Sequence, residues 1–380
     1  MIRSRQQVTG NSRASSSQPR PGDHKAPPRT HSIDILNFFL IWLTLVLALA
    51  WPYQLFLFSY IVIGPWHYLT EINWLDKQKY FLRPNDSRVF LWAMVGLVLL
   101  LTAGTLFPAI QNLQWAKPLY QAVYGSPGGP FAQVVRWSWS LMLIAFVSAA
   151  AWLFTDRWSL RAPIIAFCVL SSLYFYRVPW AGILFGLLLP TICHVFLFTF
   201  VFMWYGTLKS RSGWGYLNLV SMVLAVIAIA NYRVRDESLY LSDSVVQLTL
   251  ASAFHQINYV INHWFGAMTD NKANLASPAF FKVQAFIAFA YTYHYLNWFS
   301  KTSIIKWHQV EKKKFGFSAV LWAVSLALYK VDYRLGFAAV SVLSLLHVVL
   351  EFPLNFVSIR AICSALMLKP RLASDPATHG

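Results

Sequence analysis

Charged residues are scarce in this chain of 380 residues. Asp, Glu, Lys and Arg make up 12% of the sequence, whereas 57% is hydrophobic and the mean hydropathy is +0.48. A soluble globular domain is about one-quarter charged, so the composition excludes that class. Runs of roughly 18 or more apolar residues recur along the chain, long enough to cross a bilayer as helices. The sequence therefore predicts an all-α, polytopic transmembrane helical bundle, with the lipid bilayer as its partner.

Cysteine is also scarce. The three cysteines, Cys168, Cys193 and Cys363, all lie in apolar segments, and no Cys-x-x-Cys pair occurs. An odd number so placed argues against a disulfide framework and against a thiolate metal site. Patterns for a Ser-His-Asp triad, a phosphate-binding loop, a dinucleotide fold and the His-rich boxes of membrane desaturases are absent as well. We interpret the cysteines as packing residues.

The net charge of +17 is distributed along the termini and short loops. Cytoplasmic loops of membrane proteins carry an excess of Lys and Arg, and no basic helix with interleaved aromatic residues offers a face for nucleic acid. We therefore predict no nucleic-acid partner and a cytoplasmic N-terminus.

The chain divides into three parts. We predict a disordered basic tail at 1–32, a transmembrane helical domain at 33–367 and a C-terminal tail at 368–380. About ten or eleven helices are expected, from apolar segments at 33–51, 54–74, 88–107, 138–155, 162–177, 181–207, 214–231, 245–267, 279–299, 317–330 and 335–359. Counting spans from a cytoplasmic N-terminus puts the Lys-rich loop 301–314 outside, against the charge rule. One short segment is therefore expected to be re-entrant or not a separate span.

Glutamate is the rarest charged residue, and its placement is the main clue to function. The four glutamates are Glu71, Glu237, Glu311 and Glu351, and two of them follow a histidine by four residues, in His67/Glu71 and His347/Glu351. On a helix this spacing puts both side chains on one face. An ionisable group at membrane depth costs a few kcal/mol unless it is paired, ligated or hydrated. The pairs predict an internal polar or metal site; the alternative for the first pair is a helix end with Glu71 facing water.

Further histidines occupy the apolar segments between these pairs. His194 follows Pro190 and is either a metal ligand or a donor to a backbone carbonyl that the proline frees. His294 lies among tyrosines, as a buried ligand or a proton carrier. His255 shares a helix face with Asn258 and Asn262, although such a polar stripe can simply join helices.

These residues together predict a metal centre. Imidazoles with carboxylates and no thiolates suit Fe, Zn, Cu or Mn, and non-haem iron is the usual choice for oxygen chemistry. We expect His67, His294 and His347 as ligands, with His194 or His255 completing the set, and Glu71 and Glu351 as orienting groups or further ligands. Tyr293 is expected at the catalytic site, and Tyr68, Asn258, Asn262 and His263 are expected to line the substrate pocket.

Several short elements carry a resemblance to a known family. Gly64-Pro65-Trp66-His67…Glu71, Tyr293-His294-Tyr295 and the apolar stretches ending in His194 and His347 resemble elements of the Brp/Blh-type membrane carotene dioxygenases. This resemblance implies single histidines on separate helices that hold a non-haem iron, and cleavage of a carotenoid double bond. The runs Gly64–Leu75 and Tyr293–Lys301 also resemble an uncharacterised class of bacterial membrane proteins, which implies a bacterial cytoplasmic membrane.

The leading hypothesis is an integral membrane oxidoreductase, oxygenase-like, that acts on a hydrophobic, lipid-like or isoprenoid small molecule. The alternatives are a proton-coupled transporter that uses buried His and Glu residues, and a structural or assembly protein whose histidines join helices. The enzyme hypothesis requires the histidines to converge, and it requires the helices carrying the two His-x-x-x-Glu pairs to pack together.

Overall fold

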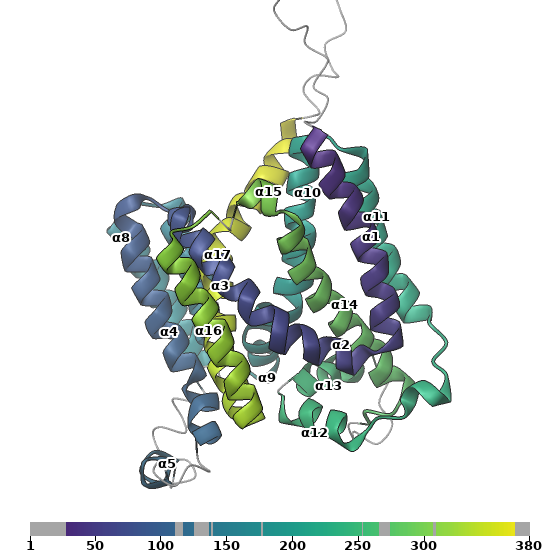
Figure 1. Cartoon of the computed structure of the whole chain (residues 1–380). Coiled ribbons are helices and arrows are strands. Elements are labelled where there is room, and N and C mark those ends of the chain that lie inside the picture. The colour runs from purple at the N-terminus through teal and green to yellow at the C-terminus, as the bar shows by residue number, and fades with distance from the viewer. Residues whose placement is uncertain are drawn as a thin grey trace, which may run out of the picture.

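The computed structural model describes residues 28–110, 117–124, 137, 140–175, 178–252, 254–265, 274–306 and 309–368 (Figure 1). Within these residues all regular secondary structure is helical, so the predicted all-α fold is confirmed. The predicted tails lie almost entirely outside the described residues, since the first helix begins at Pro28 and the last ends at Leu368.

Each apolar segment of the sequence forms one helix or a series of consecutive helices. In chain order these are α1 (Pro28–Ala50), α2 (Pro52–Phe58), the π-helix η1 (Ser59–Ile63), α3 (Gly64–Lys77), η2 (Lys79–Phe81), α4 (Pro84–Ile110), α5 (Lys117–Tyr124), α7 (Leu141–Phe154), α8 (Trp158–Phe175), α9 (Pro179–Ala181), the π-helix η4 (Gly182–Phe198), α10 (Thr199–Ser210), α11 (Gly213–Asn231), η5 (Asp236–Leu239), α12 (Asp243–Ala251), α13 (Phe254–Trp264), α14 (Pro278–Ser300), α15 (Thr302–Ile305), α16 (Lys312–Val331) and α17 (Tyr333–Leu368).

Among the described residues, 6 helices are long and apolar enough to cross a membrane: His31–Ala50, Pro84–Ala103, Gly182–Ser210, Gly213–Asn231, Lys312–Val331 and Tyr333–Met367. Their outer faces carry exposed apolar side chains, such as Phe39 on α1, Trp92 on α4 and Val320 on α16. Contact of these apolar faces with lipid tails costs no free energy, whereas their exposure to water would be unfavourable. The chain is a helical membrane protein.

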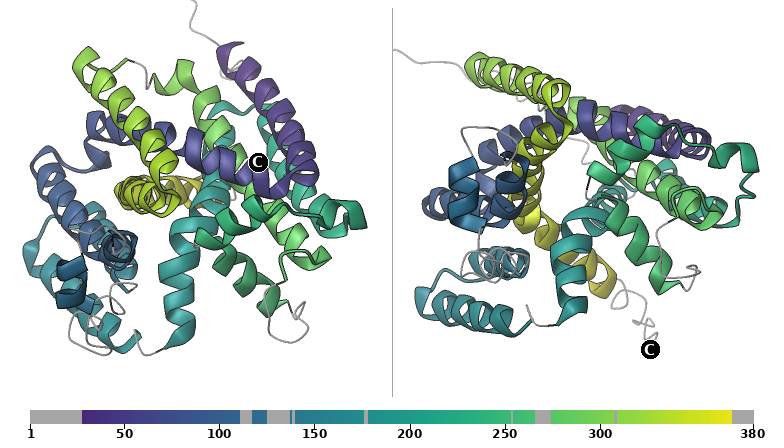
Figure 2. Two further views of the ribbon diagram at one scale, coloured as in Figure 1. Left: turned by 60° about the horizontal axis from the view of Figure 1, so that its bottom comes forward. Right: turned by 90° about the horizontal axis from the view of Figure 1, so that it is seen from below.

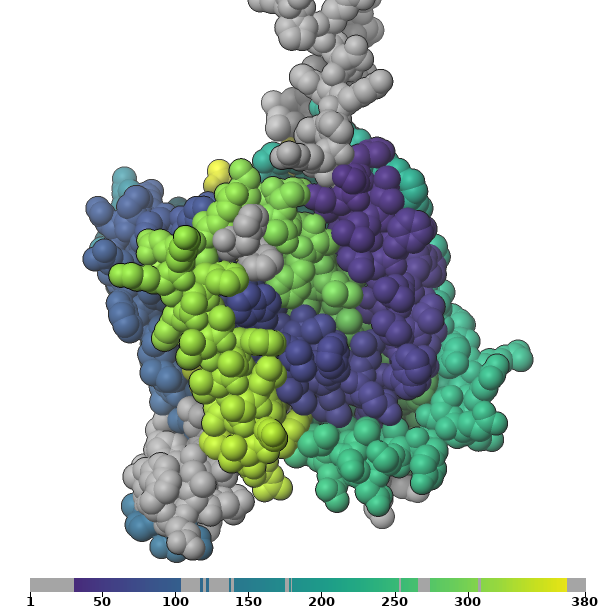
Figure 3. All heavy atoms as spheres, in the orientation of Figure 1, coloured from purple at the N-terminus to yellow at the C-terminus, as the bar shows by residue number. Residues whose placement is uncertain are grey.

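Two helices organise the interior. α14 is buried on nearly all sides, with Ala285, Ile287 and Phe289 fully inaccessible, and it packs against α1, α2, α13 and η4. α17 packs against α3, α4, α7, α10 and α16. In the space-filling view α1, α2 and α16 form the front face, with α14 visible between α1 and α16 (Figure 3). The view from below shows α17 among these partners (Figure 2).

The segment 245–267 does not form a single span. It is divided into α12 and α13, because the backbone becomes extended at Ser252 (φ −82°, ψ 143°). Both helices stay at one end of the bundle: α12 lies beside the start of α17, and Asn258 of α13 donates to the Phe280 carbonyl at the start of α14 (Figure 1). Of the shorter segments, 317–330 lies in α16, which is a candidate span, whereas 162–175 lies in α8, which is shorter than a span.

This arrangement removes the conflict with the charge rule. Lys314 forms an ion pair with Asp76 (2.8 Å), and Lys77 donates to the Gln309 carbonyl. The Lys-rich loop 301–314 and the loop after α3 therefore lie at the same end of the bundle, where α1 also begins (Figure 1). The basic side chains gathered there are Lys77, Lys79, Arg83, Lys209, Arg211, Lys301, Lys306 and Lys312–Lys314.

Candidate metal centre

Four helices bring one histidine each to a common point: His67 from α3, His194 from η4, His294 from α14 and His347 from α17. All four are buried, with 0%, 1%, 6% and 2% of their surface exposed. The Nε2 atoms of His67 and His294 are 3.0 Å apart, and those of His194 and His347 are 3.1 Å apart. Separate elements of the chain therefore build one histidine cluster.

The two glutamates of the His-x-x-x-Glu pairs lie beside these rings. Glu71 Oε2 is 3.1 Å from His67 Nε2, and Glu351 Oε2 is 3.3 Å from His194 Nδ1. The two carboxyl groups also lie within hydrogen-bond reach of each other. Because α3 packs against α17, both pairs flank a single site. Glu351 meets the histidine of another helix, His194, in addition to its own.

The spacing of these atoms fits a metal ion. One ligand atom each from His67, Glu71, His294 and His347 lies within 4.8 Å of the other three. Atoms bound at about 2.1 Å to one ion lie roughly 3.0 Å apart in octahedral and 3.4 Å apart in tetrahedral geometry. Two contacts within this quartet, His67 Nε2 to His294 Nε2 at 3.0 Å and His67 Nε2 to Glu71 Oε2 at 3.1 Å, fall in that range. The donor atoms therefore approach one another as they would around a shared ion.

Hydrogen bonding does not account for all of these atoms. Glu71 Oε2 and Glu351 Oε2 are buried, and their close contacts with the rings of His67 and His194 lack hydrogen-bond geometry. A buried carboxylate without a partner is strongly unfavourable. Two carboxylates in contact must share a proton or bind a cation. A divalent ion would balance both charges, and the residues present therefore fit such an ion.

Two of the four histidines lie near the middle of candidate membrane spans. His194 stands close to the centre of the span Gly182–Ser210, and His347 close to the centre of Tyr333–Met367. α17 has 36 residues and is about 54 Å long, well beyond the roughly 30 Å of a bilayer core. The cluster therefore lies far from both ends of two candidate spans, and ionisable groups at such positions are costly and mark ion or substrate sites.

Irregular helical turns lie just before the helix of His67 and around His194. The π-helix η1 ends at Ile63 just before Gly64 and Pro65, and the π-helix η4 carries both Pro190 and His194. Proline withholds a backbone donor, and next to it the Thr191 hydroxyl donates to the Leu187 carbonyl. π-Helical turns are rare and occur mostly at functional sites. The widened turns set the direction in which His67 and His194 project.

Gly64 is required by close approach. A Cβ atom at this position would lie 2.9 Å from Tyr68 Oη and 3.1 Å from Tyr295 Oη. These two hydroxyls are 2.6 Å apart in a buried hydrogen bond. The Tyr68 ring in turn stacks on the His347 ring at 4.3 Å between centroids. Any larger residue at 64 would displace the tyrosine pair that supports His347.

Three contacts that orient the site did not follow from the sequence. Thr199 Oγ1 lies 2.7 Å from His294 Nδ1, so Nε2 of His294 is left to face the cluster; such partners fix the tautomer of a ligating histidine. The rings of Tyr295 and Trp298 pack on His67 at 4.9 and 5.6 Å between centroids. Thr199 follows His194 by five residues, and that spacing indicates a common side only where the helix is π-type.

Other predicted residues lie elsewhere. His255 is half-buried on α13, with Nδ1 2.8 Å from the Ser252 carbonyl, and the structure does not bring it to the four rings. His263 is exposed and stacks on Tyr259 of its own helix. The extended backbone at Ser252 holds α13 at the end of the bundle. The rings of His255 and His263 therefore do not reach the cluster of four histidines.

Asn258 and Asn262 are buried, but Asn258 joins α13 to α14 and Asn262 bonds to Asn258 of its own helix. Asn258 Nδ2 donates to the Phe280 carbonyl of α14 at 3.0 Å, and Asn262 Nδ2 donates to Asn258 Oδ1 at 2.6 Å. Tyr293 is also turned away from the cluster, since its hydroxyl donates to Asn37 Oδ1 of α1. The substrate-pocket and catalytic roles predicted for these residues have no support in this arrangement.

A cavity of about 460 Å³ adjoins the centre. His67, Glu71, His294 and Glu351 form its inner end, and aromatic and aliphatic side chains of α3, α10, α14, α15 and α17 form most of its walls. It extends toward the basic end of the bundle, where Lys209 and Lys301 line it. The centre is therefore connected to a mainly apolar chamber.

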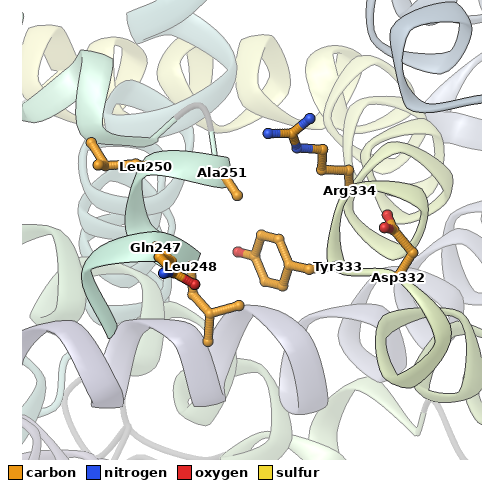
Figure 4. Close-up of a pocket in the computed structure, with 7 residues that line it drawn as sticks. All are labelled: Gln247, Leu248, Leu250, Ala251, Asp332, Tyr333 and Arg334. Atoms are coloured by element: carbon orange, nitrogen blue, oxygen red, sulfur yellow. The ribbon is translucent and has the colours of Figure 1, made fainter. Parts of the chain in front are cut away.

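A second pocket, of about 540 Å³, lies at the opposite end between α12 and the start of α17 (Figure 4). Tyr333 projects into it, with Asp332 and Arg334 beside it (Figure 4). Asp332 Oδ1 accepts from the Leu335 backbone N–H, as a helix-capping residue does. This pocket has no histidine, cysteine or glutamate in its lining and offers no comparable chemistry.

No protein-family model matches the chain, and it has no significant match among curated proteins or solved structures.

Proposed function

We propose that this protein is an integral membrane oxidoreductase, oxygenase-like, in which a histidine- and carboxylate-ligated metal ion acts on a lipid-like substrate. The observation that carries the proposal is the group of His67, Glu71, His294 and His347, with His194 and Glu351 beside it, whose carboxylate oxygens lack a well-aligned protein donor. Such a group costs stability in a purely structural protein.

Iron is the metal we propose. The donor set contains only imidazole and carboxylate, which suits iron, zinc, copper or manganese. The resemblance of Gly64–Glu71 and Tyr293–Tyr295 to the Brp/Blh-type dioxygenases favours non-haem iron, which supplies oxygen chemistry. His67, His294 and His347 would hold the ion, with His194 and the two glutamates completing its surroundings and balancing its charge.

The protein residues have further roles in this proposal. Thr199 holds the His294 ring in one tautomer, and Tyr68 supports His347 from the opposite side. The Trp298 indole donates to Thr70 Oγ1 at 3.1 Å and closes one side of the centre. The apolar walls of the cavity bind the hydrocarbon and exclude bulk water.

The basic residues at the end where α1 begins support a cytoplasmic location for that end. A bacterial cytoplasmic membrane, the N-terminus inside, is the location we propose. The cavity then opens toward the cytoplasmic leaflet.

Metal analysis of protein purified in a mild detergent tests the proposal. We expect about one ion or more per chain, and loss of nearly all of it in His67→Ala and His347→Ala. His255→Ala and His263→Ala are matched controls from α13 and should retain the metal. A wild-type protein with metal far below one per chain, unchanged by His67→Ala, would contradict the proposal.

A proton-coupled transporter is the second candidate. It is favoured by the contact between Glu71 and Glu351, which can share a proton, and by a cavity that reaches one end of the bundle. Uptake driven by a pH gradient in proteoliposomes of metal-stripped protein, abolished by Glu351→Gln, would favour this function over the enzyme.

A further inference from the structure

The cavity beside the metal centre has a polar and cationic outer part that the proposed reaction does not use. Lys301, the residue after α14, and Lys209, near the end of α10, both line it, and Asp34 of α1 is its one acidic lining residue outside the centre. Among the described residues no ion pair is formed by either lysine. The outer part of the cavity therefore has a net positive charge.

Buried polar atoms without partners face the same cavity. Asn297 Oδ1, Asn218 Oδ1 and Ser358 Oγ have no hydrogen-bond partner, and their residues are 6%, 2% and 0% exposed. All three residues line the cavity. They come from α14, α11 and α17, so the polar belt is built by three separate helices. Buried polar groups are nearly always satisfied in folded proteins, and a belt of unsatisfied ones indicates a polar ligand group.

The distance from the two lysines to the histidine cluster leaves room for part of a hydrocarbon chain, and Asn297 of the polar belt lies between them, three residues after His294. Lys301 follows His294 by seven residues, which is two helical turns. The two residues therefore lie on the same face near the end of α14, about 10 Å apart along its axis. Thr199 and Lys209 on α10 are separated by about 15 Å in the same direction. Between them the walls include Phe202, Trp74 and Leu354. The cavity is thus cationic at one end, has mainly apolar walls with single polar groups between, and reaches the proposed metal ligands at the other end.

We infer that this cavity binds a single-chain amphiphile with an anionic headgroup, a carboxylate or a phosphate monoester. The headgroup lies at Lys301 and Lys209, and the hydrocarbon extends past Trp74 and Phe202 toward His294. This inference deepens the proposed function, because the ligand would be the substrate of the metal centre. The geometry then directs the reaction to a carbon about 10–15 Å from the headgroup.

Binding measurements on the full chain in nanodiscs of zwitterionic phospholipid test the inference. The probes are hexadecanoic acid, hexadecyl phosphate, hexadecanol and inorganic phosphate, with bound probe counted by native mass spectrometry. We expect one of the two anionic amphiphiles to bind about tenfold or more tightly than hexadecanol, and inorganic phosphate not to bind. Which anion binds distinguishes a carboxylate from a phosphate headgroup.

Variants identify the site. Lys301→Gln should weaken binding of the anionic amphiphile about tenfold and leave hexadecanol unchanged, and Asn297→Ala should weaken it less. Lys330→Gln, an exposed lysine at the other end of the bundle, is the matched control. Equal binding of acid and alcohol, tight binding of inorganic phosphate alone, or unchanged binding in Lys301→Gln would overturn the inference.

Metal content is measured on the same samples. Lys301→Gln should keep its metal, because Lys301 is two turns from the ligands. Metal present without amphiphile binding contradicts this inference and leaves the proposed function standing. Amphiphile binding without metal contradicts the proposed function and leaves the cavity as a lipid-binding site.

Discussion

The candidate metal centre and the α12–α13 segment share one pattern in the sequence but differ in structure. Both place histidine beside other polar residues in apolar stretches. In α13 the polar groups are satisfied by protein atoms: His255 by the Ser252 carbonyl, Asn258 by the Phe280 carbonyl. In the centre Glu71 Oε2 and Glu351 Oε2 are deeply buried and unsatisfied. The two regions differ in whether their buried polar atoms find partners within the protein, and this difference, more than residue type, distinguishes a candidate ligand site from a contact between helices.

The largest effect on metal affinity is expected from substitution of the glutamates, because they distinguish the candidate centre from α13 most clearly. Glu351→Gln removes one of the two charges that balance the ion, so metal affinity should fall by about 100-fold or more. In stripped protein the same change removes the contact between two carboxyls, and its melting temperature should not fall. Melting curves with and without a chelator measure both effects. Glu237→Gln, at an exposed position, is the control, and an equal loss of metal in it would contradict the assignment.

A smaller effect is expected from the orienting threonine. Thr199→Val keeps the volume of the side chain but removes the hydrogen bond to His294 Nδ1. Loss of such a partner lowers metal affinity about 10- to 100-fold, which competition with a chelator of known affinity can measure. Thr249→Val on α12 removes a hydroxyl that bonds only its own helix, at the Val245 carbonyl, and should leave affinity unchanged. If both variants behave alike, Thr199 has no orienting role.

The smallest effect is expected in α13. Asn258→Ala removes the bond to the Phe280 carbonyl and should destabilise the fold by about 1 kcal/mol, as for other polar contacts between membrane helices. Metal content should stay that of the wild type. Denaturant or thermal unfolding in detergent gives the stability, with Gln256→Ala, exposed on the same helix, as the control. Loss of metal in Asn258→Ala would break the distinction between the two regions.

Much of the fold follows from local composition. Apolar runs such as 88–107 and 335–359 predict helices because a bilayer leaves no other way to satisfy the backbone of a single segment. The helix break at Ser252 was not predictable, since the run 245–267 is long enough to span. Hydropathy measures transfer of a segment into lipid, and it is insensitive to one residue whose backbone turns extended.

The site was predictable in part for a related reason. Helical spacing puts His67 with Glu71 and His347 with Glu351 on common faces, and their burial cost indicates a partner. The tyrosines on either side of His294 show what helical spacing could not predict. Tyr293 and Tyr295 flank the histidine at about 100° to either side, and only packing decides that Tyr295 faces His67 while Tyr293 faces Asn37.

The sequence by itself determined the class of the protein and the need for a polar interior. Few charges, long apolar runs and two buried His-x-x-x-Glu pairs carry that information, because transfer free energies depend on residue type and local spacing. Only the tertiary packing brings His67, His194, His294 and His347 together, keeps His255 away from them, and places Lys301 in the wall of the adjoining cavity. Those outcomes depend on which helices pack together and how each is rotated, and both are settled by contacts between residues far apart in the chain.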